Sequence, residues 1–316
     1  MNTAGKTVSS RTSWQQRHKV DLKRLKQNVP FFIMFAPVIL YFLVFKYAPM
    51  GGLIIAFKNY NFADGLFGSP WVGFGQFETL FSSPQTLQII RNTLVLSVLS
   101  LIIGFPFPII VAILLNEVGR TWFKRWVQTI IYLPHFLSWV IVSGMVVTIF
   151  SMEGLVNDFL IRWLGEPVSF LYNEYSWITI FIASGIWKGA GWGAIIYLAA
   201  LSAVDPSLYE SASIDGANKF RQIYHITLPG IAPTIFILFI LSVGNVMEVG
   251  FDQVYTLANT AVYQVSEVIS TYTYRVGLQQ LQFSLTAAMG FFESLIGLVL
   301  VLITNAVARR FGQGLW

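Results

Sequence analysis

Few residues in this 316-residue chain could do chemistry, and they lie far apart. Cysteine is absent, which excludes a thiolate metal site and a cysteine nucleophile. The three histidines, His18, His135 and His225, lack the spacing of metal ligands. Asp252, Glu267 and the acids near them form no catalytic pair, and no glycine-rich phosphate loop ends in Lys-Ser or Lys-Thr. We therefore expect a protein that is not an enzyme, holds no metal and does not hydrolyse ATP itself.

Two charged residues stand inside strongly apolar runs. Lys188 lies near the middle of 176–200, and Glu293 lies within 284–308. At the centre of a bilayer a charge costs about 2.5–3.5 kcal/mol on insertion scales, so each residue needs a partner or a water-filled cavity. One interpretation is an ion pair between Lys188 and Glu293 inside a helical bundle, with the nearby aromatic residues packed in the core or at the membrane interface.

The other interpretation is an aqueous lumen through which a solute passes. Aromatic rings suit the apolar faces of ring-shaped solutes, and the ammonium group of Lys188 suits a carboxylate. This lumen would be lined by Trp187, Lys188, Trp192 and Tyr197, met by Asn245 and Glu248 of the next apolar run. Alternatively, the side-chain amide of Asn245 joins two helices by a hydrogen bond, as amides in apolar spans often do.

A polar segment with helix-forming composition separates two apolar runs near the C-terminal third of the chain. Asp205 and Pro206 form a helix-start signal, with Asp as the cap and Pro at the first helical position. We predict a helix to about residue 214. Asp215-Gly216 should end it, because Gly tolerates the backbone angles of a break and Asp can cap the next helix.

A second short helix is predicted over 217–225, ending before Leu228-Pro229. The two helices form a bent element, the elbow (residues 205–225). Its small side chains allow another surface to approach closely. Its acid, Glu210, could pair with an arginine of that surface.

Composition indicates a membrane protein. Only 11% of residues are charged, while 55% are hydrophobic and 16% aromatic; a soluble domain carries about 25% charged residues. The apolar runs are continuous over about 20 residues and do not alternate, so they are helices and not barrel strands. The lipid bilayer is then a partner, and nucleic acid is not. We predict an all-α integral membrane protein with six transmembrane helices, at about 29–49, 88–115, 126–150, 176–200, 231–251 and 284–308.

Basic residues predict the orientation of these helices. With the N-terminus in the cytosol, seven of the 20 Lys and Arg residues fall in 1–28 and seven more in the later cytosolic segments. Six remain in the spans and outer loops, so the bias favours an N-in, C-in topology with the elbow in the cytosol. Residues 1–28 form either a short amphipathic helix on an anionic leaflet or a disordered tail. No small-residue cleavage pattern follows the first run, so we expect an anchor.

The outer segments should differ in structure. Residues 50–87 are expected to form an ordered extracytosolic loop. Residues 151–175 carry apolar side chains at helical spacing, which predicts a short interfacial helix closed by Gly165 and Pro167. Residues 253–283 should form a helical lip over the outer mouth of the bundle. No internal repeat is visible, which does not support an inverted-repeat secondary transporter.

The elbow carries a resemblance to a known family. Its residues read Glu210-Ser-Ala, then Asp215-Gly216-Ala217, then Ile226-Thr-Leu-Pro229. In this register the segment resembles the signature loop of binding-protein-dependent ABC importer permeases of the type I fold, although Ser211 replaces the usual first alanine. In that family the loop is the coupling helix that docks on the ATPase subunit. Further segments resemble the polysaccharide and oligosaccharide subgroup: 46–52, 56–60, Asn92-Thr93, 133–136, 186–188 and 272–277.

The resemblance implies an ATP-driven importer of oligosaccharides, acidic alginate-like chains among them, in the bacterial cytoplasmic (inner) membrane. This chain would be one permease subunit with no cofactor of its own. Its partners would be two ATP-binding cassette subunits that bind ATP and Mg²⁺, a second, paralogous permease, and an extracytosolic solute-binding protein. The residues implied to dock on the ATPase are Tyr209, Glu210, Ala212, Asp215, Gly216 and Ala217.

The lip holds a further candidate contact. Arg275, with Tyr272 and Tyr274, would meet a docked binding protein or incoming substrate, or else belong to a solvated loop face. The chain then divides into a cytosolic basic segment (1–28), a permease domain (29–308) that contains the coupling loop (201–230), and a cytosolic tail (309–316).

Two rival functions make different predictions. A secondary transporter driven by an ion gradient would use Lys188 and Glu293 as a relay, and would transport without ATP or a stable ATPase partner. A membrane-embedded enzyme acting on glycans or lipids would need acids or histidines clustered at one membrane depth. The sequence shows no such cluster.

Overall fold

The computed structural model describes residues 28–310, 312 and 314. The N-terminal amphipathic helix or tail expected over 1–28 therefore lies, except for Asn28, outside the described residues, as does half of the tail expected over 309–316. The chain separates into two units, Met1–Ile54 and Ile55–Trp316. In the first unit, α2 (Val29–Phe42) continues through a π-helical turn (Leu43–Tyr47) into α3 (Ala48–Met50).

Six helical segments of the described residues are long and apolar enough to cross a membrane, as predicted. The described residues contain no strand beyond one isolated bridge between Lys58 and Trp71. The six segments are Val29–Phe57, Pro84–Glu117, Trp139–Leu164, Glu174–Ser202, Lys219–Gly244 and Phe283–Arg310. The first segment contains α2 and α3. The other five contain α6 (Pro84–Gly104) with α7 (Pro106–Glu117), α9 (Trp139–Phe150) with α10 (Leu155–Leu164), α11 (Glu174–Ser202), α13 (Lys219–Gln222) with α14 (Leu228–Gly244), and α18 (Phe283–Arg310).

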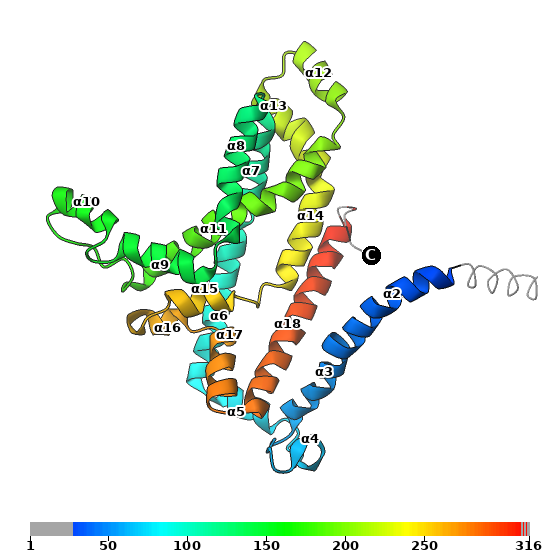
Figure 1. Ribbon diagram of the computed structural model, residues 1–316, viewed down its shortest axis with the longest axis vertical. Helices are drawn as coiled ribbons and strands as arrows, with labels where there is room; N and C mark the ends of the chain where they lie inside the picture. Colours follow the sequence, from blue (N-terminus) through cyan, green and yellow to red (C-terminus); the bar gives the residue numbers. More distant parts are fainter. Residues whose placement is uncertain (1–27, 311, 313, 315–316) are drawn as a thin grey trace, which may run out of the picture. The chain divides into compact units, whose positions relative to one another are not determined.

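The third predicted span, 126–150, is wrong. The chain forms α8 (Thr121–Tyr132), a 3₁₀ turn (Leu133–Phe136) and then α9 in a new direction (Figure 1). Pro134 explains the break, because it lacks an N–H and disfavours a helical residue before it. The candidate span begins only at Trp139 and continues into α10.

The fifth predicted span, 231–251, is displaced along the chain. The helix already begins at Lys219, runs through a π-helical turn (Ile223–Thr227) and ends at Gly244. Leu228-Pro229 does not close the second helix of the elbow, which also corrects that prediction. Pro229 lies in the first turn of α14, directly after the π-helical turn, and the helix continues through it.

The long helix α11 is the centre of the second unit. It packs against α6, α7, α8, α9, α14 and α15 (Phe251–Leu257). Gly191 permits the contact with α8, because a Cβ there would lie 2.2 Å from the carbonyl oxygen of Ile131. Trp177 is buried at the other end of α11, where its Nε1 donates to the carbonyl oxygen of Leu257 at 3.0 Å.

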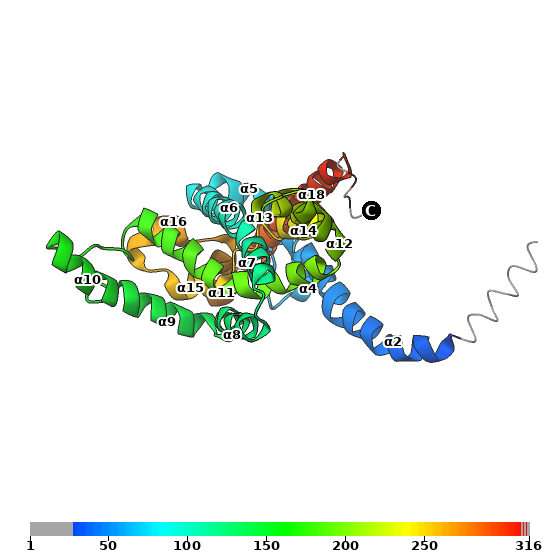
Figure 2. The same cartoon turned by 90° about the horizontal axis from the view of Figure 1, so that it is seen from above.

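The remaining segments are helical. The helix α10 ends at Gly165, whose φ of 83° is the left-handed conformation expected of a closing glycine, and both views place α10 beyond the far end of α9 (Figures 1 and 2). The loop 50–87 is ordered and includes a 3₁₀ helix (Gly51–Phe57), α4 (Gly65–Gly68) and α5 (Gly75–Ser82). The lip is helical as predicted: α15, a 3₁₀ turn (Thr260–Val262), α16 (Tyr263–Ser266), α17 (Ile269–Tyr272) and a π-helical segment (Thr273–Gln279).

Candidate functional site

The first helix of the elbow begins as the sequence predicts. The helix α12 (Pro206–Ile214) has Pro206 in its first turn, and Oδ1 of Asp205 accepts a hydrogen bond from the backbone N–H of Ser207 at 2.9 Å. This backbone hydrogen bond lowers the pKa of Asp205, because it favours the charged carboxylate.

The bend of the elbow is a Schellman motif around Gly216. Its φ is +77°, and its N–H donates to the carbonyl oxygen of Ser213 at 3.2 Å. The N–H of Ala217 donates to the carbonyl oxygen of Ala212 at 2.9 Å, which completes the motif. Asp215 ends α12 and does not cap the next helix, contrary to the prediction.

Asn218 caps the second helix instead. Its side chain accepts from the N–H of Arg221 at 2.9 Å, so the helix starts at Lys219 and not at Ala217. The sequence contained this signal, since Asn is among the best N-cap residues.

Side chains brace the elbow against the membrane helices. The hydroxyl groups of Tyr209 and Thr227 lie 3.0 Å apart, and Nε2 of Gln222 donates to Oγ of Ser213 at 2.9 Å. Lys219 forms an ion pair of 2.9 Å with Glu117 at the end of α7. Tyr209 is half-buried and therefore acts first as a brace. The elbow is thus held in one conformation at the end of the second unit where α7 and α13 meet (Figure 1).

The outer face of the elbow is exposed and mixed in character. Glu210 is exposed, and its carboxylate takes part in neither ion pair of the described residues. Ile214 is 87% exposed and Phe220 77%, which is unusual for apolar side chains at a polar bend. Among the other predicted docking residues, Asp215 and Gly216 are exposed, whereas Ala212 and Ala217 are half-buried.

Lys188 is bound by backbone carbonyl groups. Its Nζ donates to the carbonyl oxygens of Pro134 at 3.4 Å, His135 at 2.7 Å and Leu137 at 2.6 Å, and lies 5.6 Å from the ring centroid of Trp139. These carbonyls belong to the break between α8 and α9, where helical hydrogen bonding is interrupted; that of Pro134 also accepts from the backbone N–H of Leu137 at 3.2 Å. Lys188 forms no ion pair with Glu293 in the described residues, so that predicted pairing is wrong.

The aromatic residues predicted for the lumen point to different places. Trp192 stacks on His135, with ring centroids 4.5 Å apart. Trp187 lines an apolar cavity of about 550 Å³ between α9 and α11. Tyr197 is 3% exposed and packs in a core cluster of α7, α11 and α14, so it is no lumen residue in this structure.

Asn245 and Glu248 do come together in a polar cleft. They lie after the end of α14 and not within a span, because Asn245 is the residue that caps the helix. Both line two adjoining cavities, of about 470 Å³ toward α18 and about 270 Å³ toward α6. A third cavity of about 310 Å³ continues between α6 and α11 and shares Ser100, Phe181 and Gln253 with the second. We call these three cavities the polar cleft.

Sequence reasoning missed most of the polar cleft. Gln253 fixes one wall, since its Nε2 donates to the carbonyl oxygen of Phe181 at 2.7 Å. Hydroxyl, amide and carboxylate groups in the middle of apolar helices were the available signal, as these are costly in lipid. The missed polar residues are Ser97, Ser100, Ser242, Gln253 and Ser294, whereas Glu293, which the sequence predicted to need a partner or a water-filled cavity, does line the cleft.

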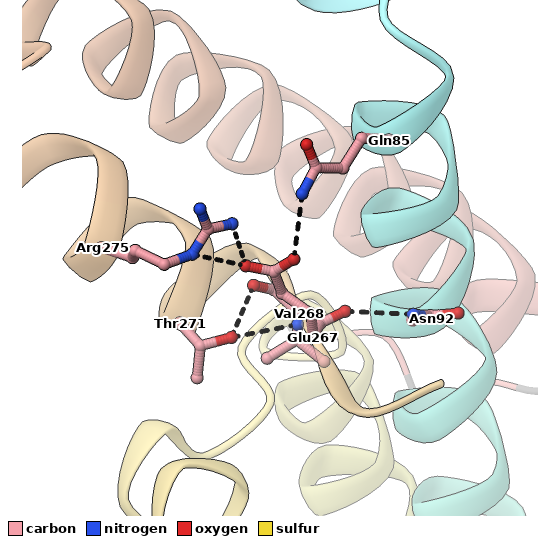
Figure 3. Close-up of polar contacts among 6 residues, drawn as sticks. All are labelled: Gln85, Asn92, Glu267, Val268, Thr271 and Arg275. Atoms are coloured by element: carbon pink, nitrogen blue, oxygen red, sulfur yellow. Dashed lines mark hydrogen bonds and ion pairs between the residues drawn. The ribbon is translucent and has the colours of Figure 1, made fainter. Parts of the chain in front are cut away.

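Arg275 in the lip has a buried partner that the sequence did not indicate. Its Nε donates to Oε1 of Glu267 at 3.0 Å, and its Nη2 contacts the same oxygen (Figure 3). Oε2 of Glu267 accepts from Gln85 at 3.5 Å, and the backbone carbonyl of Glu267 accepts from Asn92 at 3.1 Å. Burial lowers the pKa of Arg275, because it disfavours the charged guanidinium. The hydrogen bond and the negative charge of Glu267 have the larger combined effect, and the pKa of Arg275 is raised.

The two tyrosines predicted beside Arg275 have different environments. Tyr272 is 6% exposed and packs in a core cluster with α6 and α18, so little of it is accessible to a docked protein. Tyr274 is half-buried and faces Phe251 and Tyr255. Among the described residues no group of three His, Cys, Asp or Glu side chains could hold a metal ion.

Known proteins resemble the chain over nearly its whole length. Residues 104–315 match the family described as "Binding-protein-dependent transport system inner membrane component". The polygalacturonan/rhamnogalacturonan transport system permease protein YteP of Bacillus subtilis is 45% identical over 95% of this chain and 94% of its own length. Protein LplB of the same organism is 41% identical over 98% and 95%.

A solved structure is similar as well. The crystal structure of a bacterial ABC transporter involved in the import of the acidic polysaccharide alginate contains a chain that is 44% identical to this one. The match covers 92% of this chain and 98% of that chain, with a TM-score of 0.84. The same similarity holds for that transporter in complex with an alginate pentasaccharide-bound periplasmic protein.

Proposed function

The chain belongs to the family of binding-protein-dependent transport system inner membrane components, and from that premise we propose that it is one permease subunit of an ATP-driven oligosaccharide importer. The observation that carries the proposal is the elbow: a rigid, capped bend that presents Glu210, Ile214 and Phe220 outward from the end of two membrane helices. An ATPase subunit grips this surface, and its movement passes through the braces at Tyr209 and Lys219 into α14 and α7.

The polar cleft is proposed as this subunit's part of the sugar pathway. Its hydroxyl, amide and carboxylate groups can exchange hydrogen bonds with sugar hydroxyls, as a pathway for carbohydrates requires. Glu248 and Glu293 accept from hydroxyls and do not attract a uronate. The similarity to importers of polygalacturonan and alginate nevertheless supports acidic oligosaccharides as cargo. Any cationic group that binds the carboxylate of the cargo therefore lies outside the polar cleft.

The complete importer is proposed to hold four further components. ATP and Mg²⁺ bind to two separate ATP-binding cassette subunits. A second, paralogous permease supplies the other half of the pathway, and a solute-binding protein delivers the cargo to the lip. Binding protein and ATP act on one equilibrium between inward-open and outward-open states, each by favouring the state it binds better.

The proposal requires the elbow and the C-terminus to face the cytosol. Reporter fusions after Arg221 and after Arg310 should both report a cytosolic location, because the basic residues are concentrated on that side. Alkaline phosphatase, active only outside, and a cytosol-active fluorescent protein give opposite readouts at each site. An extracytosolic location at either site would contradict the topology and the docking role together.

Uptake in proteoliposomes tests the function itself. The permease pair, ATPase and binding protein should accumulate radiolabelled oligogalacturonate or oligoalginate only when ATP is enclosed with the ATPase. The rival, a secondary transporter, predicts uptake driven by an ion gradient without ATPase. Its proposed relay lacks support, since Lys188 is bound to three carbonyl groups and not to Glu293. Gradient-driven uptake by the permeases alone would overturn the proposal.

A further inference from the structure

We propose that a cavity in the lip, beside Arg275, is a binding site for a sugar residue that carries a carboxylate. The inference rests on the proposed function, in which oligosaccharides enter from the side of the lip. The cavity measures about 330 Å³ and is separate from the polar cleft, with which it shares no lining residue. We call it the lip cavity; its lining includes Tyr255, Ala258, Tyr263, Glu267, Tyr274, Arg275 and Gln279.

Aromatic rings line one part of the lip cavity. Tyr255 and Tyr274 pack edge to face with centroids 5.5 Å apart, and Phe251 stacks on Tyr255 at 5.1 Å. The ring contacts fix the orientation of both tyrosines, while Tyr255 stays 54% exposed. A pre-organised aromatic surface of this kind suits the apolar face of a sugar ring, and the phenol groups suit its hydroxyls.

The ion pair beside these rings is asymmetric in exposure. The side chain of Glu267 is 5% exposed, whereas that of Arg275 is 33% exposed. Both partners line the cavity, but the guanidinium is much the more exposed of the two. Nε and Nη2 of Arg275 donate to Glu267, and Nη1 takes no part in the ion pair. A guanidinium has five N–H donors, so it can bind a second carboxylate while the first holds it in place.

The position of Arg275 is also fixed from other directions. Its guanidinium carbon lies 6.0 Å from the ring of Tyr263 and 5.8 Å from that of Tyr272. Glu267 is held in turn by Gln85 and Asn92 of α6 (Figure 3). Burial and the neighbouring Glu267 raise the pKa of Tyr263 to about 12, so its phenol stays neutral and does not repel an anion.

The charged residues of the other cavities also favour the lip cavity as the site for an acidic sugar. Of the five cavities described in the chain, the lip cavity is the one with a basic lining residue. Lys188, which the sequence favoured for binding a uronate, is already engaged by backbone carbonyl groups. The carboxylates of the polar cleft have no basic side chain in its lining, whereas Glu267 of the lip cavity is paired with Arg275. Recognition of an acidic sugar by this subunit thus belongs to the lip, before the sugar reaches the membrane interior.

The test compares trigalacturonate with its methyl ester, which has nearly the same shape and no charge. The assembled transporter in nanodiscs, without the binding protein, should bind the acid about tenfold or more tightly than the ester, the size expected for a charge-assisted hydrogen bond. Ala258→Trp fills the lip cavity while keeping both residues of the ion pair, and should abolish binding of both forms there. Arg275→Gln combined with Glu267→Gln removes both charges and should abolish the preference for the acid.

Controls separate a binding defect from a folding defect. Arg162→Gln removes an exposed arginine from α10 and should leave the preference unchanged. The melting temperature of each variant shows whether it folds. If the double variant does not fold, the loss of binding in Ala258→Trp still tests the lip cavity.

The outcomes of the lip-cavity test and of the uptake test are distinguishable. Absence of ATP-dependent uptake by the wild type would refute the proposed function. Normal ATP-dependent uptake, with acid and ester bound equally by the wild type or binding unaffected in folded Ala258→Trp, would refute the lip cavity alone.

Discussion

Replacing Lys188 by methionine should prevent the permease from folding stably, and so abolish uptake of acidic and neutral oligosaccharides alike. The ammonium group satisfies three carbonyl oxygens at the break between α8 and α9. Methionine has a similar length and no donor. Each buried acceptor left without a partner costs about 1–3 kcal/mol, and in a lipid environment water cannot replace the donor. The carbonyl of Pro134 keeps the N–H of Leu137 as a donor, but the loss at His135 and Leu137 together is a large share of a stability of about 5–15 kcal/mol.

The measurement is the yield and melting temperature of the purified permease, followed by uptake of trigalacturonate and of a neutral oligosaccharide. Lys188→Arg retains charge and donors, so it should keep a folded protein, although the planar group fits three converging carbonyls less well. Lys46→Met removes an exposed lysine and serves as the matched control. A folded, stable Met variant that loses only acidic uptake would show instead that Lys188 binds cargo.

Lys188 also shows what the sequence could and could not predict. Its position in an apolar run correctly indicated that it needs a partner. The partner is a set of backbone groups about 50 residues earlier, created by the break that Pro134 imposes. A backbone carbonyl carries no residue type, so no pattern of side chains could reveal it. An acid in another apolar run, Glu293, was the visible alternative and was wrong.

The elbow was the most predictable region because its structure is local. The cap at Asp205, the bend at Gly216 and the helix between them depend on residues within one or two turns of each other. The end of the second helix was mispredicted where a π-helical turn carries the chain past Pro229. Such a turn shifts the hydrogen-bond register by one residue, and the sequence gives no clear sign of it.

The lip was only partly predictable from the sequence. Arg275 stood out as a charge among tyrosines, but Glu267 lies eight positions away, outside the spacing of three or four that brings side chains together on one helix. Two extended residues between α16 and α17, Glu267 itself and Val268, and the π-helical segment bring the two side chains together. Only the fold shows that Glu267 is buried and Arg275 partly exposed.

Ile214→Asp should detach the ATPase without unfolding the permease. Ile214 ends α12 and is 87% exposed, so its side chain contributes little to the fold. An apolar anchor buried by a partner is often worth 2 kcal/mol or more, or about 30-fold in affinity, and an aspartate in the same place adds a desolvation cost. We expect at least a tenfold loss of ATPase co-purification and a similar loss of ATP-dependent uptake, with an unchanged melting temperature.

Leu278→Asp is the matched control for this variant. Leu278 is also exposed (62%) and apolar, but it lies in the lip, far along the chain from the elbow. It should leave ATPase co-purification intact, because the proposed docking surface consists of elbow residues. Retention of the ATPase by Ile214→Asp would mean that this apolar residue is not an anchor. Retention of the ATPase together with loss of uptake would place Ile214 in the transmission of movement to α14, since binding would then survive while coupling fails.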